Sequence, residues 1–178
     1  MSTFEFISVF ISIIFGLALA HLLTSAMTHL FRGKLGYERG AYLLLMTTLI
    51  LSQWWTLFRW KAFQTWTFDA FAVLTLWALT VFAMPVALYP PGEEVTSEIK
   101  HRKTFFAVFA AMGALDVAQA AILGQLFQPW YYPLFIGHYW VLAALAVFVK
   151  NPVVRNVVAT YFAVSLILWL LVVRRFLT

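Results

Sequence analysis

The sequence predicts an all-α integral membrane protein in which six transmembrane helices form one compact bundle. Hydrophobic residues make up 63% of its 178 residues and charged residues only 11%. In soluble domains, about 45–50% of residues are apolar and about 25% are charged. The apolar residues run in long unbroken segments, unlike the short alternating strands of a membrane barrel. Because lipid cannot satisfy free backbone N–H and C=O groups, segments of this kind must be helical.

Six apolar segments are long enough to cross a bilayer, since a hydrocarbon core of about 30 Å needs roughly 20 helical residues. We expect a single transmembrane domain over 1–178, with spans at about 4–31, 41–61, 68–89, 104–127, 131–149 and 153–173. The connections contain residues that end or begin helices, such as the prolines of YPPGEE and the Asn-Pro pair of KNP. The first segment is expected to be retained and not cleaved as a signal peptide, because the first ten residues of the chain contain Glu5 and no Lys or Arg, and the apolar run continues to Phe31.

Basic residues are distributed unequally between the two predicted faces. One face holds Arg32, Lys34, Arg39, Lys100, Arg102, Lys103, Lys150 and Arg155, and the other holds Arg59, Lys61, Arg174 and Arg175. By the positive-inside rule, both termini are expected on the non-cytoplasmic side of a bacterial inner (cytoplasmic) membrane. In this class of protein the basic excess sets topology, so we expect membrane lipids as neighbours and no nucleic-acid partner.

Asp116 is the most informative polar residue, because it lies inside the apolar segment 104–127, about 18 Å along a helix from Thr104. An ionised carboxylate facing lipid at such depth costs about 2.5–3.5 kcal/mol. No Lys or Arg lies at this depth in a predicted span, so we expect a neutral or shared-proton carboxyl that faces protein. The candidate proton or cation site comprises Asp116, Gln119, His138, Gln53 and His21, with Ser52 beside Gln53. An inert hydrogen-bonded packing contact fits the same pattern.

A row of small residues follows one face of the first predicted helix at a spacing of four. The row consists of Ser8, Ser12, Gly16, Ala20, Thr24 and Thr28. Small side chains at this spacing form a groove that lets a second helix approach closely. The row therefore predicts tight helix packing, either within the chain, in a homo-oligomer, or against a partner membrane subunit.

Aromatic residues gather towards the predicted non-cytoplasmic face. Trp54, Trp55 and Trp130 belong to this group, and Arg59 lies among them in SQWWTLFRWK. A belt of aromatic side chains at the headgroup level explains the pattern in the simplest way. The alternative is an aromatic pocket, formed by these four residues, for a lipid headgroup, an isoprenoid or a cationic ligand.

The leading functional hypothesis is a small channel or transporter, with Asp116 carrying a proton or cation and a histidine tuning its affinity. A structural or accessory membrane subunit, packing through the first helix, is the second hypothesis. An intramembrane enzyme acting on a lipid or isoprenoid is the third, although a non-enzymatic role is favoured. The sequence lacks cysteine and the nucleotide-binding and zinc-protease motifs. No cofactor and no metal are therefore expected.

Overall fold

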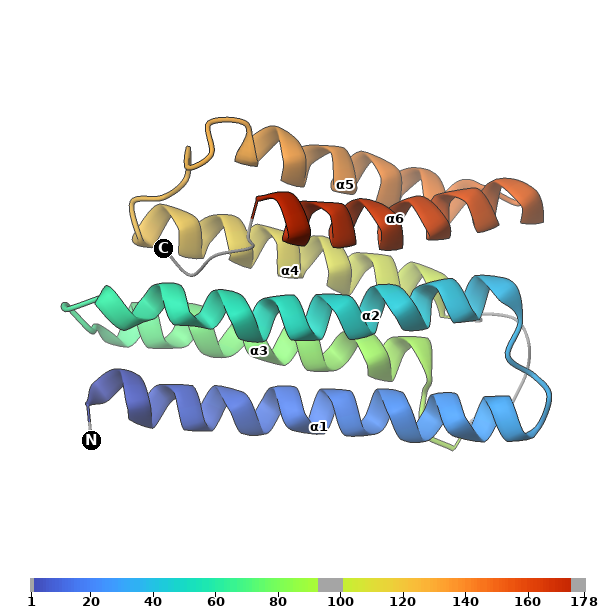
Figure 1. Cartoon of the computed structure of the whole chain (residues 1–178), viewed down its shortest axis with the longest axis horizontal. Helices are drawn as coiled ribbons and strands as arrows, with labels where there is room; N and C mark the ends of the chain where they lie inside the picture. The colour runs from blue at the N-terminus through green and yellow to red at the C-terminus, as the bar shows by residue number, and fades with distance from the viewer. Residues whose placement is uncertain (1, 93–100, 174–178) are drawn as a thin grey trace.

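The computed structural model describes residues 2–92 and 101–173, which form six α-helices that run alternately up and down the bundle (Figure 1). The helices are α1 (Thr3–Phe31), α2 (Tyr37–Thr56), α3 (Phe68–Leu88), α4 (Arg102–Ile122), α5 (Tyr132–Phe148) and α6 (Pro152–Val172). A short 3₁₀ helix, η1 (Leu57–Ala62), continues α2 without a break. Helix α1 begins, and α6 ends, at the same end of the bundle.

Five of the described helical segments are long and apolar enough to cross a membrane, so the all-helical, apolar architecture agrees with the prediction. Helix α5 is shorter, with 17 residues, or about 26 Å. Helix α4 ends at Ile122, where the predicted span continued to 127. Gly124 adopts φ of 66°, and the Gln125 N–H bonds to the carbonyl of Ala120, which together form a common helix-ending motif.

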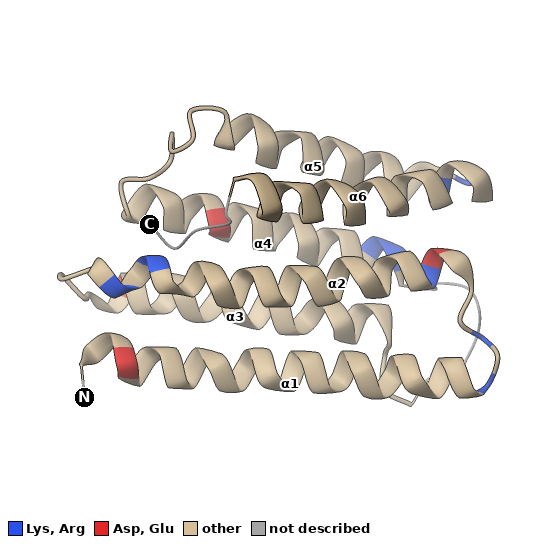
Figure 2. Cartoon of the chain, viewed as in Figure 1, with Lys and Arg blue, Asp and Glu red and all other residues tan. Residues whose placement is uncertain are grey.

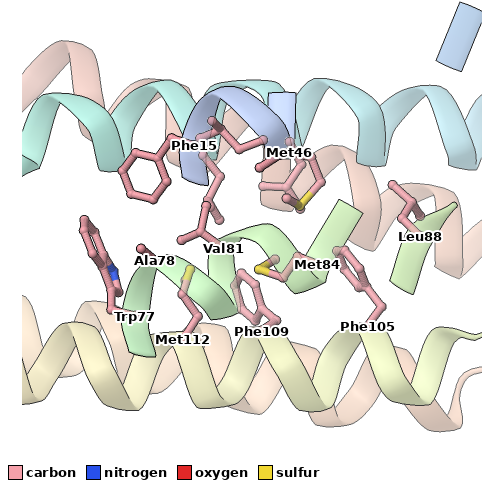
Figure 3. Packing of buried hydrophobic residues seen from close by; sticks show 14 of the residues in the cluster. Phe15, Met46, Trp77, Ala78, Val81, Met84, Leu88, Phe105, Phe109 and Met112 are labelled. Atoms are coloured by element: carbon pink, nitrogen blue, oxygen red, sulfur yellow. The ribbon is translucent and has the colours of Figure 1, made fainter. Parts of the chain in front are cut away.

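Helix α3 lies at the centre of the bundle and packs mainly against α1 and α4, whereas α2 packs mainly against α6. Figure 3 shows how side chains from these helices meet in the buried core. Phe15 of α1 meets Trp77 of α3 edge to face at a ring-centroid distance of 5.3 Å, and both are buried. Phe109 of α4 lies in the same buried cluster. Because α2 and α4 each pack on other partners, a space lined by both helices remains between them.

Helix α1 packs within the chain mainly through an apolar face that is distinct from its row of small residues. The buried face consists of Ile7, Ile11, Phe15, Ala18, Leu22 and Ala26. Gly16 of the small-residue row has open space where a Cβ would stand, and Ala20 of the same row is exposed. Ser12 makes a direct contact, accepting a hydrogen bond from the Trp54 indole. Packing of this row against another chain stays a prediction.

Charged residues lie towards the two ends of the bundle (Figure 2). At the end where α2, α4 and α6 begin, the Glu38 carboxylate accepts a 2.7 Å hydrogen bond from Arg102. Its second oxygen lies 3.3 Å from a guanidinium nitrogen of Arg155. One carboxylate of α2 therefore ties the first turns of α4 and α6 together.

A second polar contact lies at the same end, between α1, α2 and the residue after α3. The buried Arg39 donates to the ring nitrogen Nε2 of His29 at 2.6 Å. Its guanidinium also lies 5.2 Å from the ring centroid of Tyr89, a cation–π distance. Burial raises the pKa of Tyr89 to about 12, against the opposing charge of Arg39, so its phenol is neutral at physiological pH.

We expect Glu38→Gln to lower the free energy of unfolding by roughly 1–3 kcal/mol, because an amide cannot compensate the charges of two partly buried guanidinium groups. Thermal unfolding of the purified protein in detergent measures the change. Glu5→Gln is the matched control, since glutamine also fits the capping box that begins α1. Equal losses in the two variants would contradict a role for Glu38 in joining three helices.

Candidate functional site

A cavity of about 70 Å³ lies between α2, α4, α5 and α6, with room for a few water molecules. Most of its polar lining residues come from one end of the bundle, where α2, η1 and α4 end and α5 begins. They are Ser52, Gln53, Thr56, Arg59, Asp116 and Tyr132. The walls further along the helices are mainly apolar, and include Leu45, Leu49, Phe109, Phe135, Ile136 and Leu166. Tyr139 also lines this part, with its hydroxyl hydrogen-bonded to Ser165 at 2.8 Å. The cavity is therefore amphipathic, with a polar end and an apolar body.

Asp116 stands at the polar end and contacts two of the other lining residues. The Tyr132 hydroxyl donates a 2.5 Å hydrogen bond to its Oδ2 atom. A guanidinium nitrogen of Arg59 lies 3.8 Å from its Oδ1 atom. The Arg59 and Asp116 side chains are only 9% and 13% exposed. Asp116 thus forms a mostly buried ion pair as well as a hydrogen bond.

The expectation that no basic side chain reaches Asp116 is wrong, for two geometric reasons. The 3₁₀ helix η1 continues α2 and brings Arg59 beside α4. The sequence pattern instead predicts that Arg59 lies at the membrane surface. Helix α4 also ends at Ile122, so Asp116 lies about 9 Å from its end rather than at its middle. The polar end of the cavity therefore lies in one half of the bundle, nearer the end that carries η1.

Arg59 leaves part of its hydrogen-bonding capacity unused. Its Nε and Nη1 atoms are buried and have no hydrogen-bond partner among the described residues. The 3.8 Å distance to Asp116 is also longer than a direct hydrogen bond. Most buried donors in proteins are satisfied, so an incompletely paired guanidinium in a cavity wall requires an explanation.

Gln119 belongs to a different contact from the one the sequence predicted. Its Oε1 atom accepts a 3.0 Å hydrogen bond from the indole of Trp60, and both side chains are buried. Trp60 also stacks on Trp66, with ring centroids 5.4 Å apart. Gln119 therefore holds η1 against α4, and this contact positions the adjacent Arg59.

The two histidines of the predicted site do not join Asp116. His138 lies on α5 among aromatic rings, 4.1 Å from the ring centroid of Tyr139, and does not line the cavity. The Nε2 atom of His21 lies 2.9 Å from the carbonyl oxygen of Tyr89, beyond the end of α3. Gln53 does line the cavity with Asp116. The structure thus brings together two of the five predicted residues, and places Gln119 on an adjoining contact.

The predicted aromatic pocket is not assembled around Arg59. Trp54 packs against Phe15 of α1, while Trp55 and Trp130 are exposed. The tryptophans that line the cavity are instead Trp140 of α5 and Trp169 of α6.

Gly113 allows the Trp140 indole to pack closely against α4 in the cavity wall. A Cβ on Gly113 would lie 2.8 Å from the Trp140 indole nitrogen, so the close approach of this ring to α4 requires glycine. The Trp169 ring stacks on Phe135 at a centroid distance of 3.7 Å. Tyr132, Trp140 and Trp169 are therefore cavity residues that the sequence pattern did not identify.

Comparison with known proteins adds no family: no protein-family model, curated protein or solved structure matches the chain. Within the described ranges, no three side chains of His, Asp or Glu lie close enough together to hold a metal ion. The groups lining the cavity that can ionise are the Arg59 guanidinium, the Asp116 carboxyl and the phenols of Tyr132 and Tyr139. Such a set can bind a polar group and can exchange protons.

Proposed function

We propose that this chain is an integral membrane protein and that all six α-helices, including α5, cross the bilayer. The outer face of α5 supports this, because it presents exposed apolar side chains such as Leu134, Val141 and Phe148. Apolar surface of this extent is costly in water and favourable in lipid. Trp130 and Tyr131 precede α5 and Lys150 follows it, and such residues typically anchor helix ends at the interface.

We also propose that both termini face the non-cytoplasmic side of a bacterial inner membrane. The end of the bundle opposite the termini carries the larger share of Lys and Arg (Figure 2). Cytoplasmic connections are typically enriched in these residues.

The chain has no cysteine, so single-cysteine variants test this topology directly. We expect a membrane-impermeant maleimide to label Thr65→Cys in intact spheroplasts, and Lys34→Cys only after permeabilisation. These residues lie in connections at opposite ends of the bundle. The reverse pattern would contradict the orientation, and labelling of both residues without permeabilisation would contradict the transmembrane arrangement.

We propose that the cavity binds a small amphipathic, lipid-like molecule. The observation that supports this most directly is its division into a polar end at Arg59, Asp116 and Tyr132 and an apolar body. Ligand sites commonly combine apolar walls with a few convergent polar groups that fix orientation. The polar end lies about 9 Å from the end of α4, a depth at which the polar part of an amphipathic molecule is accommodated near the interface.

Leu49→Phe should weaken binding at least tenfold, because Leu49 is a 2% exposed cavity wall and the larger ring occupies ligand space. Brominated long-chain probes that quench Trp140 and Trp169 fluorescence measure affinity in detergent. Leu44→Phe is the matched control, since Leu44 lies on the same helix and is 49% exposed. The proposal would be contradicted by wild-type protein that shows no saturable quenching, or by equal affinities in the two variants.

Proton movement is a second candidate function, favoured by the 2.5 Å hydrogen bond between Tyr132 and Asp116 beside a cavity with room for water. An acid–phenol pair of this kind can pass a proton to water at its edge. Cation movement is less well supported, because the Arg59 guanidinium lies 3.8 Å from the same carboxyl and repels a second cation. If the cavity supports transport, we therefore propose that protons, and not other cations, are the species that move.

If protons move through this site, Asp116→Asn should abolish proton flux into proteoliposomes, and Tyr132→Phe should reduce it about tenfold or more. A pH-sensitive dye inside the vesicles measures the flux. Asp69→Asn serves as the control, since Asp69 is exposed in the first turn of α3. Absence of flux through the wild type, or flux unchanged by Asp116→Asn, would exclude this function.

A further inference from the structure

The charge that the cavity offers to a ligand is that of Arg59. Its side chain is 9% exposed and lines the cavity. Its Nε and Nη1 atoms have no hydrogen-bond partner among the described residues. A guanidinium presents a planar set of donors that matches the oxygen pair of a carboxylate or phosphate. The unused donors of Arg59 are therefore complementary to an oxyanion.

Asp116 does not satisfy this requirement. Its Oδ2 atom accepts the 2.5 Å hydrogen bond from Tyr132, while its Oδ1 atom stays 3.8 Å from the Arg59 guanidinium. A direct, bidentate arginine–carboxylate pair would show two distances of about 2.7–2.9 Å. Tyr132 therefore holds the carboxyl of Asp116 at a distance that leaves the guanidinium available to a second acidic group.

The rest of the cavity limits the chemistry of the ligand that carries this second acidic group. The walls beyond the polar end are mainly apolar, since the Tyr139 hydroxyl there is already bonded to Ser165, and the volume of about 70 Å³ holds a compact polar group and a few carbon atoms. A longer chain would have to continue beyond the cavity, where the surrounding helix faces are themselves apolar. A water-soluble polyanion does not fit these walls, whereas a single anionic group on a hydrocarbon chain does.

We propose that the molecule bound in this cavity is an anionic amphiphile whose carboxylate or phosphate pairs with Arg59. This inference rests on the proposed binding function and specifies its ligand class. Asp116 is the competing acid in this arrangement: it neutralises Arg59 when the cavity is empty and repels the ligand anion when it is filled. Replacing Arg59 and replacing Asp116 should consequently have opposite effects on anion affinity.

Three probes with the same hydrocarbon chain test the inference: oleate, oleyl phosphate and oleyl alcohol. Their affinities are measured in an uncharged maltoside detergent, as displacement of a brominated probe that quenches the cavity tryptophans. For the wild type we expect at least one of the two anions to bind about tenfold or more tightly than the alcohol. Tighter binding of oleate assigns a free carboxylate, and tighter binding of oleyl phosphate assigns a phosphate headgroup.

The variants separate a ligand site from a purely structural ion pair. In Arg59→Gln, the anionic probe and oleyl alcohol should bind with about equal affinity. Asp116→Asn should raise the affinity for the anion several-fold. Lys61→Gln is the matched control, because Lys61 is an exposed basic residue of the same short helix and should leave the preference unchanged. Should Arg59→Gln not fold, the opposite sign expected for Asp116→Asn still tests the inference.

The outcomes distinguish failure of the inference from failure of the proposed function. If none of the three probes binds the wild type, the binding function is wrong and the inference with it. If all three bind equally, the binding function stands and the anion assignment is overturned. A preference that persists in Arg59→Gln, or anion affinity that falls in Asp116→Asn, also overturns it.

Discussion

The hydrogen bond between Trp60 and Gln119 is the contact on which the geometry of the cavity depends. It joins two buried side chains at 3.0 Å and holds η1 against α4. A polar bond of this kind is strong in an apolar environment, because losing one partner leaves the other unsatisfied. Arg59 precedes Trp60 directly, and Asp116 lies one turn before Gln119. Fixing one pair of side chains therefore also brings the two charges of the cavity together.

The two ends of the bundle use charge in different ways. At the end where α2 begins, Glu38 contacts two arginines and joins three helices. At the other end, Arg59 and Asp116 lie in the wall of a cavity, 3.8 Å apart. Arg59 leaves two buried nitrogens, Nε and Nη1, without a hydrogen-bond partner among the described residues, whereas Arg102 and Arg155 each leave only Nε. The first arrangement has a structural explanation, because one carboxylate offsets the charges of two guanidinium groups. The second leaves more of one guanidinium unpaired, in a cavity wall, which is more typical of a binding site than of a packing contact.

The apolar helices could be predicted from the sequence because their signal is local and periodic. Long apolar runs and helix-ending residues place the helices within a few residues, with two exceptions. Gly124 ends α4 early, and α2 begins at Tyr37 and gives way to η1 after Thr56, where the sequence predicts a span over 41–61. The contents of the cavity could not be predicted in the same way. Position along a span gives depth in the membrane but not direction around the helix axis. His138, His21 and Gln53 are therefore equally good candidates for contact with Asp116. The arrangement of Arg59 depends on η1, whose 3₁₀ path is decided by tertiary contacts such as that of Trp60.

The position of Arg59 also gives Asp116 an environment different from the one that the sequence predicts. Alone in an apolar segment, a carboxyl is best accommodated in its neutral form, because no neighbour offsets the cost of its charge. In the structure, Asp116 instead has a guanidinium 3.8 Å from one carboxyl oxygen and a phenol that donates a hydrogen bond to the other. The guanidinium keeps its charge in proteins, so Arg59 is the fixed charge of the cavity wall. An anion bound to Arg59 competes with the Asp116 carboxyl for this one cation, which is why replacing the two residues is expected to change anion affinity in opposite directions.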